Sequence, residues 1–251
     1  MNEFAKLVEL VATLRGEEGC PWDKKQTLPS FKTFLLEEVY ELIEAIEKDN
    51  VQALKEELGD LLFHIIFIAQ ICEEQKRFDI KGVLEEEYRK MYNRHPHVFL
   101  KEAPEKPIQK RWEEIKKEEK EDYSLLSNIP VSVPALLRAY TITRRVARVG
   151  FDWERLEDIY EKMYEEIGEL KKAEDTGDAA AVKEEIGDLL FTIVNISRVH
   201  NVDPEDALRA TSEKFIRRFN YIEKNTDLTK ASLSDMDSLW DEIKNMEKQG
   251  G

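Results

Sequence analysis

The feature that most constrains this 251-residue chain is an internal repeat. The segment LLEEVYELIEA, residues 35–45, matches MYEEIGELKKA 128 residues later, and VQALKEELGDLLFHII, residues 51–66, matches AAAVKEEIGDLLFTIV at the same offset. Two long matches at one offset indicate two copies of a single structural unit. We therefore predict a tandem duplication with domains at 1–124 and 125–251, separated in the proline-containing stretch SLLSNIPVSVP.

Each copy is predicted to be helical. Apolar residues recur at three- and four-residue spacing, and no stretch shows sustained alternation of apolar and polar residues. Ser30 is a candidate N-cap for the first long helix. The predicted fold class is all-α, a helical bundle in each copy, with helices expected at about 30–48, 51–75, 81–94, 135–149 and 204–224 and around Trp240.

Four acidic residues in the second copy indicate a shared site. Glu166 and Glu169 lie three residues apart on one predicted helix, and Glu185 and Asp188 lie three apart on the next. Gly177 lies midway between the pairs in a turn-forming stretch, so a helical hairpin there brings the pairs face to face. The first copy repeats the quartet with Glu38, Glu41, Glu57 and Asp60.

Such a quartet predicts a metal site. Two carboxylates about 5 Å apart repel by roughly 3 kcal/mol at an effective dielectric near 20, so a cation is needed to stabilise the cluster. Oxygen ligands favour Mg²⁺, with Mn²⁺ as a substitute, over zinc or copper. A single glutamate usually belongs to a solvated helix face, but the same quartet in both copies favours a metal site. A di-iron bundle would need Glu-x-x-His motifs, and the chain has none.

Composition limits the partners. The formal net charge of −15 argues against nucleic acid as the main partner, because binding to phosphate backbones depends on lysine and arginine. The longest apolar run, residues 61–69, contains His64 and is too short to span a membrane. The N-terminus has no signal-peptide pattern, and Cys20 and Cys72 form neither a disulfide framework nor a zinc motif. We expect a cytoplasmic protein with no membrane partner.

These motifs carry a family resemblance. Two copies of Glu-Glu-x-x-Glu followed by Glu-x-x-Asp-Leu-Leu-Phe, with Cys-Pro-Trp-Asp at 20–23, resemble the MazG family of nucleoside triphosphate pyrophosphohydrolases, within the all-α NTP pyrophosphatase superfamily. The resemblance covers nearly the whole chain and assigns metal binding to both quartets. It implies Mg²⁺-dependent hydrolysis of NTPs and dNTPs to NMP and pyrophosphate with broad base tolerance. It also implies a homodimer in which helices from two subunits complete each site.

Cationic and aromatic residues are candidates for substrate binding. Lys162 lies one helical turn before Glu166, where its ammonium group can reach a bound phosphate, whereas the first copy has Phe34 at that position. Trp22 and Trp153 are expected in the core. The resemblance assigns triphosphate binding to the basic pair on the fourth helix of each copy and makes the other two tryptophans candidates for nucleotide contact. The candidates are Lys214, Arg218 and Trp240 in the second copy and Lys90, Arg94 and Trp112 in the first.

Two glycines lie inside predicted helices, immediately before the aspartate of each quartet. Gly59 and Gly187 each cost about 1 kcal/mol relative to alanine at such a position. The repetition suggests close approach of another helix or of the nucleotide. A packing accommodation unrelated to a ligand explains it equally well.

The predicted reaction is hydrolysis at the α-phosphorus. Mg²⁺ on the quartet would bind phosphate oxygens and activate a water, while lysine and arginine stabilise the departing pyrophosphate. Two alternatives stay open: a narrow pyrophosphatase for dUTP or phosphoribosyl-ATP, and a non-enzymatic helical regulator that binds partners through acidic hairpins. The predicted catalytic residues are Glu166, Glu169, Glu185, Asp188 and Lys162.

Overall fold

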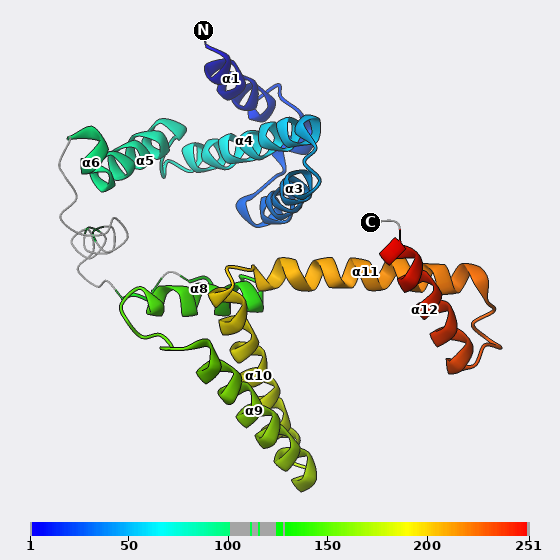
Figure 1. Cartoon of the computed structure of the whole chain (residues 1–251). Helices are drawn as coiled ribbons and strands as arrows, with labels where there is room; N and C mark the ends of the chain where they lie inside the picture. The colour runs from blue at the N-terminus through cyan, green and yellow to red at the C-terminus, as the bar shows by residue number, and fades with distance from the viewer. Residues whose placement is uncertain (1, 101–110, 112–114, 116–123, 128, 250–251) are drawn as a thin grey trace. The chain divides into compact units, whose positions relative to one another are not determined.

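The computed structural model describes residues 2–100, 111, 115, 124–127 and 129–249 (Figure 1). These residues form helices and no strand, which confirms the predicted all-α class. The chain divides into two compact units, Met1–Glu105 and Lys106–Gly251, and each contains one copy of the repeat. The predicted domain boundary between residues 124 and 125 stays a prediction. No helix in the described part of the chain is long and apolar enough to cross a membrane.

The first unit is built on an antiparallel hairpin of α3 and α4, against which α1 and α5 pack. Its core consists of Val11 from α1, Phe31 from α3, and Ile66, Phe67 and Ile71 from α4, all almost completely buried. The helices are α1 (Glu3–Arg15), α2 (Pro21–Lys24), α3 (Leu28–Glu47), α4 (Val51–Glu74), α5 (Ile80–Arg94) and α6 (Pro96–Phe99).

The beginning of α3 corrects one prediction. Thr27, not Ser30, is the N-cap, and its hydroxyl accepts a hydrogen bond from the backbone N–H of Ser30. The Ser30 hydroxyl in turn accepts one from the backbone N–H of Thr27, which completes a capping box. The prediction failed because a proline at the second helical position looks like the end of a loop, although Pro29 belongs to the first turn of the helix.

Arg15 holds three segments of the first unit together. Its side chain is only 6% exposed, and Nε and Nη2 each donate a 2.7 Å hydrogen bond to the carboxylate of Glu74 at the end of α4. Nη1 donates to the carbonyl of Asp23 in α2 at 2.6 Å, and the guanidinium lies 5.1 Å from the centre of the Phe67 ring. One buried cation therefore connects α1, α2 and α4.

The second unit is built on the hairpin of α9 and α10, with α8 packed against α10 and α11. At its far end, α12 packs on α11. Figure 1 shows α11 and α12 as an arm that leads away from the α9–α10 hairpin. The helices are α8 (Ala135–Ala147), α9 (Leu156–Thr176), α10 (Ala179–Val199), α11 (Pro204–Asn225) and α12 (Leu233–Gln249).

The predicted hairpin turn at Gly177 is present, and the first unit has a counterpart at residues 49–50. Gly177 ends α9 with φ of +69°, in the left-handed region that favours glycine, and Asp178 caps α10 by accepting from the N–H groups of Ala180 and Ala181. In the first unit, Asp49 has φ of +48° and Asn50 caps α4. The quartets therefore lie on facing helices, as the repeat predicted.

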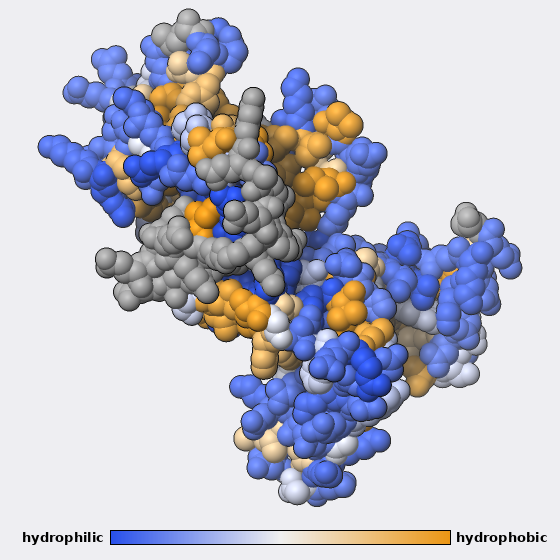
Figure 2. Space-filling model, turned by 60° about the vertical axis from the view of Figure 1, so that its left-hand side comes forward, coloured by the Kyte–Doolittle hydropathy of each residue, from blue (hydrophilic) through white to orange (hydrophobic). Residues whose placement is uncertain are grey.

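Apolar side chains remain exposed along one line of the second helix of each hairpin, α4 and α10. They follow i, i+4, i+7 spacing and so share a helix face. On the face shown in Figure 2, apolar patches interrupt a mostly hydrophilic surface. The two stripes consist of Leu58, Leu62 and Ile65 on α4, and of Ile186, Leu190 and Ile193 on α10.

Candidate active site

Three carboxylates of the second copy converge between α9 and α10. Glu166, Glu185 and Asp188 each offer an oxygen, and these oxygens all lie within 4.8 Å of one another. Glu166 is buried, Glu185 is half-buried and Asp188 is exposed, so the cluster is closed on one side and open to solvent on the other. Glu169, the fourth member of the predicted quartet, lies outside this triad.

The electrostatics of the triad favour a cation. Burial raises the pKa of Glu185, and the nearby negative charges of Glu169, Glu166 and Asp188 raise it further. Glu169 is therefore close enough to act on the cluster although it is not one of the three convergent ligands. A divalent cation would relieve both effects, and an all-oxygen donor set suits Mg²⁺ or Mn²⁺.

Lys162 is the cation that already contacts the cluster. Its Nζ lies 2.7 Å from Glu166 Oε1 and 2.9 Å from Glu165 Oε1. These hydrogen bonds raise the pKa of Lys162 above its ordinary value, so the ammonium group stays charged at neutral pH. Lys162 is half-buried at the edge of the site, where its charge faces any anion that approaches the triad.

The first copy has a related triad. Oxygens of Glu38, Glu41 and Glu57 lie within 4.8 Å of one another, and Asp60 lies outside them. Burial and the neighbouring carboxylates, including Asp60, raise the pKa of both Glu38 and Glu57. Glu57 Oε2 is buried without a hydrogen-bond donor, which is the state expected of an oxygen directed at a cation. The first copy therefore also fits a divalent metal.

An aromatic cluster adjoins the first triad through His64. His64 Nδ1 lies 3.9 Å from Glu38 Oε1, and its ring centre lies 4.9 Å from that of Phe31. Phe34 lies between His64 and Trp22, at 6.5 Å and 5.7 Å between ring centres. Desolvation lowers the pKa of His64, so the imidazole is neutral at pH 7. No positive side chain takes the place of Lys162 at this position.

A cavity of about 730 Å³ adjoins the triad of the second copy. Lys162, Glu166 and Asp188 line one part of it, and the rest is lined by apolar side chains, the Arg198–Asp152 ion pair and a few uncharged polar side chains. Of this lining, the sequence predicted Lys162, Glu166 and Asp188 as site residues and did not predict the rest. The remaining lining residues are Leu126, Ile142, Thr143, Val146, Gly150, Phe151, Trp153, Phe191, Thr192 and Asn195.

Two tryptophans differ from the prediction. Trp153, expected in the core, is exposed and lines this cavity, and Trp22 is also exposed, beside Phe34. Trp22 lies in the four-residue helix α2 and Trp153 in the loop before α9, and neither segment is long enough for helical periodicity to predict burial.

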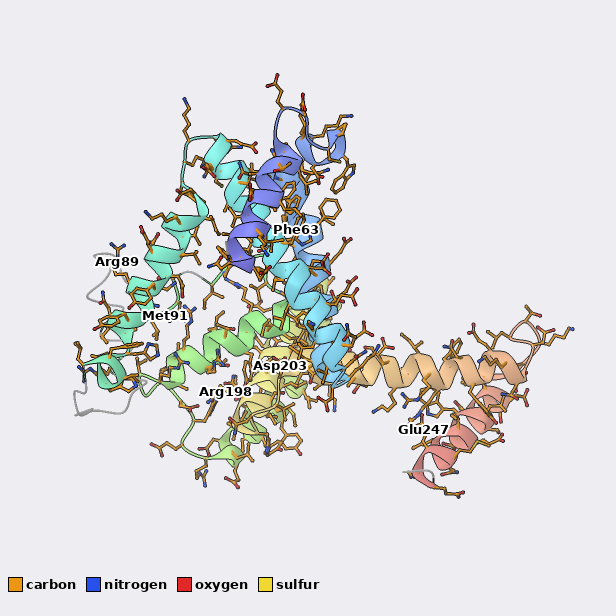
Figure 3. All side chains as sticks on the ribbon, turned by 90° about the horizontal axis from the view of Figure 1, so that it is seen from above. Phe63, Arg89, Met91, Arg198, Asp203 and Glu247 are labelled. Carbon is orange, nitrogen blue, oxygen red and sulfur yellow. The ribbon has the colours of Figure 1, made fainter. Side chains whose placement is uncertain are left out.

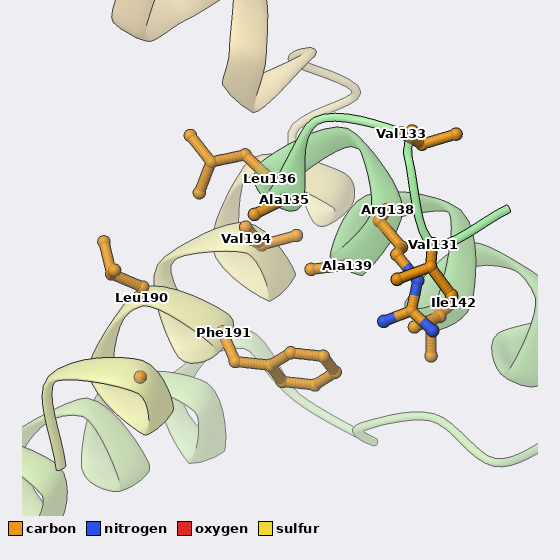
Figure 4. Close-up of a pocket in the computed structure, with 11 residues that line it drawn as sticks. Val131, Val133, Ala135, Leu136, Arg138, Ala139, Ile142, Leu190, Phe191 and Val194 are labelled. Atoms are coloured by element: carbon orange, nitrogen blue, oxygen red, sulfur yellow. The ribbon is translucent and has the colours of Figure 1, made fainter. Parts of the chain in front are cut away.

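A second, smaller pocket of about 390 Å³ lies between α8 and α10 (Figure 4). Its lining is apolar except for Arg138, and it shares Ile142 and Phe191 with the larger cavity. Gly187 also lines it.

A Cβ atom added at Gly187 or at Gly59 would meet nothing within 4 Å, so neighbours within the described chain do not require glycine at either position. Close approach of a second chain or a nucleotide stays a prediction.

The predicted phosphate-binding residues of the second copy lie on the α11–α12 arm. Arg218 donates to Glu247 at 2.8 Å, and its guanidinium lies 5.4 Å from the centre of a Trp240 ring. Figure 3 shows Glu247 on this arm and Arg198 in the body of the unit. Lys214 is exposed on α11, and neither it nor Arg218 nor Trp240 lines the cavity beside Glu166.

Two of the corresponding residues of the first copy lie on α5. Lys90 forms an ion pair with Glu87 on α5, and Arg94 is the last residue of that helix. Trp112 lies outside the described residues. The substrate-binding roles assigned to these positions stay predictions.

Comparison with known proteins identifies the family. The model of the MazG nucleotide pyrophosphohydrolase domain matches residues 26–99 and again residues 154–222. The nucleoside triphosphate pyrophosphohydrolase/pyrophosphatase MazG of Thermotoga maritima is 44% identical over 248 residues, which cover 96% of this chain and 95% of that protein. The nucleoside triphosphate pyrophosphohydrolase of Escherichia coli strain K12 is 40% identical over 260 residues, covering 98% and 99%. The chain therefore belongs to the MazG nucleotide pyrophosphohydrolase family and carries the family domain twice.

Proposed function

We propose that this chain hydrolyses nucleoside triphosphates to NMP and pyrophosphate, and that the second copy is the main site. The observation that carries the proposal is the convergence of Glu166, Glu185 and Asp188 beside Lys162 at the mouth of a cavity of about 730 Å³. The two relatives described above are named as enzymes of this kind. Broad acceptance of NTPs and dNTPs is part of the proposal.

Glu166, Glu185 and Asp188 would hold Mg²⁺, or Mn²⁺ in its place, with Glu169 beside them. When bound, a divalent cation polarises phosphate oxygens and lowers the pKa of a coordinated water. The crowded carboxylates of the triad suit this cofactor, because their mutual repulsion falls when the charge is neutralised.

Lys162 supplies the positive charge that the chain itself contributes at the triad. Its ammonium group is paired with Glu166 and Glu165, and a phosphate oxygen at the triad would lie within reach of the same side chain. Because that ammonium stays protonated, it stabilises the negative charge that builds on the departing pyrophosphate. The chain has no Gly-rich phosphate loop to position a γ-phosphate for transfer, which favours attack at the α-phosphorus.

We propose a homodimer. The exposed stripe of Ile186, Leu190 and Ile193 on α10 is apolar and continuous along one face, as expected of a helix that packs against a second chain. A dimer would also explain why Lys214 and Arg218 do not line the cavity of their own chain, because the α11–α12 arm of each chain could bring them to the cavity of its partner.

The free cysteines Cys20 and Cys72 suit a reducing compartment, and we propose a cytoplasmic location.

Turnover of the eight common NTPs and dNTPs, with and without Mg²⁺ and with product identification, tests the proposal. We expect pyrophosphate and the matching NMP from each substrate, and none after chelation of the metal. Turnover of dUTP alone would favour the narrow pyrophosphatase, and failure to release pyrophosphate from any substrate would contradict the enzymatic proposal.

A further inference from the structure

Three polar side chains run in a line along α10 from the triad into the cavity. Asp188, Thr192 and Asn195 follow i, i+4, i+7 spacing, so they share one face of the helix. At 1.5 Å per residue, Thr192 lies about 6 Å and Asn195 about 10 Å along the helix from Asp188. This order matches the order of phosphate, sugar and base in a nucleotide whose phosphates lie at the triad.

The inner part of the cavity is buried but polar, with two residues of this line on α10 and Thr143 on α8. Thr143, Thr192 and Asn195 are 3%, 6% and 8% exposed. Asn195 Nδ2 donates to the backbone carbonyl of Phe191 at 3.3 Å. Because that carbonyl only accepts, this bond fixes the amide orientation and leaves Asn195 Oδ1 as an acceptor without a hydrogen bond among the described residues.

The rest of the cavity suits a flat apolar ring. Phe151, Trp153 and Phe191 contribute aromatic surface, and Ile142 and Val146 contribute aliphatic surface. Leu126 closes one side. Its segment is held in place by Arg145, whose Nη1 donates to the carbonyls of Leu125 and Ser127 at 3.1 Å and 2.8 Å. An apolar slot that also presents the unpaired Oδ1 acceptor of Asn195 is the arrangement expected for a nucleobase with an edge donor.

The first copy lacks this arrangement. The residues that correspond to Lys162, Thr192 and Asn195 are Phe34, His64 and Phe67. The Phe67 ring stacks on Phe31 with 4.2 Å between centres, and the His64 ring packs edge-on against Phe31 at 4.9 Å. Aromatic rings therefore occupy in the first copy the positions that form the polar floor in the second.

We propose that Asn195 determines base recognition: its Oδ1 accepts a hydrogen bond from an N–H on the edge of the nucleobase. The inference rests on the proposed function, because it takes the phosphates to lie at the triad. Adenine and cytosine carry an exocyclic amino group, and guanine, uracil and thymine carry a ring N–H. One acceptor therefore admits every common base and discriminates against a base that has no edge donor.

ATP and purine ribonucleoside 5′-triphosphate, which is ATP without its exocyclic amino group, test this directly. We expect wild-type kcat/KM to favour ATP about tenfold, because the purine analogue cannot donate a hydrogen bond to Asn195 Oδ1. Asn195→Ala should reduce the ratio to near one, and Asn195→Asp, which retains an acceptor, should keep a preference for ATP. Asn225→Ala is the matched control, because Asn225 Nδ2 makes the same kind of bond to the carbonyl of Tyr221 on the arm, outside the cavity.

Binding gives a second readout that needs no turnover. The Kd of AMP and of purine ribonucleoside 5′-monophosphate, measured by calorimetry on the full chain, should differ about tenfold in wild type and converge in Asn195→Ala. Equal kcat/KM for the two triphosphates in wild type, or a preference that survives Asn195→Ala, would overturn the assignment. Failure to hydrolyse any NTP would instead contradict the proposed function, so the two failures are distinguishable.

Discussion

Lys162 is the single residue that most clearly separates the two copies. It pairs with Glu166 in the second copy, whereas Phe34 occupies the corresponding position in the first and packs against Trp22 and Phe31. A phosphate bound at the first triad therefore lacks this lysine. The difference lies at one position of an otherwise repeated motif, yet it changes the charge available to the substrate.

Metal-ligand variants test the assignment of the site. Glu166→Gln and Asp188→Asn should each lower kcat/KM by at least about 100-fold, because each removes a charged ligand. Glu38→Gln, the matched change in the first copy, should cost clearly less. Steady-state kinetics on the full chain, with circular dichroism to verify the fold, measures this. Equal losses from Glu166→Gln and Glu38→Gln would contradict the predominance of the second copy.

The Arg15–Glu74 pair predicts how stability depends on pH. The hydrogen bonds and charge of Arg15 lower the pKa of Glu74 below 4.5, so the stabilisation is present above pH 4.5 and is lost as pH falls through the lowered value. Glu74→Gln should therefore cost about 1 kcal/mol at pH 7, a modest value because Glu74 is partly exposed, and less at pH 3, where a larger fraction of the carboxylate is protonated. Urea unfolding at both pH values measures the difference. A cost that is the same at both would contradict the pairing.

At the scale of the helices, the hairpins were predictable because their determinants are local. Gly177 and Asn50 mark the turns, and the spacing of the acidic residues places both quartets on facing helices. The cavity was not predictable, because it depends on how α8 packs against α10 and on the loop that carries Trp153. These contacts join segments about 50 residues apart, which helical periodicity does not report.

Two glycines of this hairpin should respond oppositely to the same substitution. Gly177→Ala should destabilise the second unit by about 1 kcal/mol, because φ of +69° is unfavourable for a residue with a Cβ atom. Gly187→Ala should instead stabilise α10 by about 0.5–1 kcal/mol, since the helix gains a better helix former and the new Cβ meets nothing within 4 Å. Chemical unfolding measures the free energy of unfolding of both variants. A Gly187→Ala chain that is less stable than wild type as a monomer would contradict the open space found around this position.

At the scale of the whole molecule, the proposed homodimer can be tested at the α10 stripe. Leu190 is exposed at the centre of the α10 stripe, so Leu190→Glu should convert a dimer to a monomer and lower activity. Leu233→Glu is the control, because Leu233 is equally apolar and more exposed but lies at the start of α12. Analytical ultracentrifugation measures the mass. A monomeric wild type, or a dimer that both variants retain, would show that this stripe is not the interface.

The identity of the bond that breaks tests the central claim most directly. If the triad and Lys162 hold the phosphates as proposed, water attacks the α-phosphorus and pyrophosphate leaves. The reaction is run with ATP in ¹⁸O-labelled water, and both products are analysed by mass spectrometry. The account predicts AMP that carries one labelled oxygen, together with unlabelled pyrophosphate. ADP with orthophosphate, or label in the pyrophosphate, would contradict it.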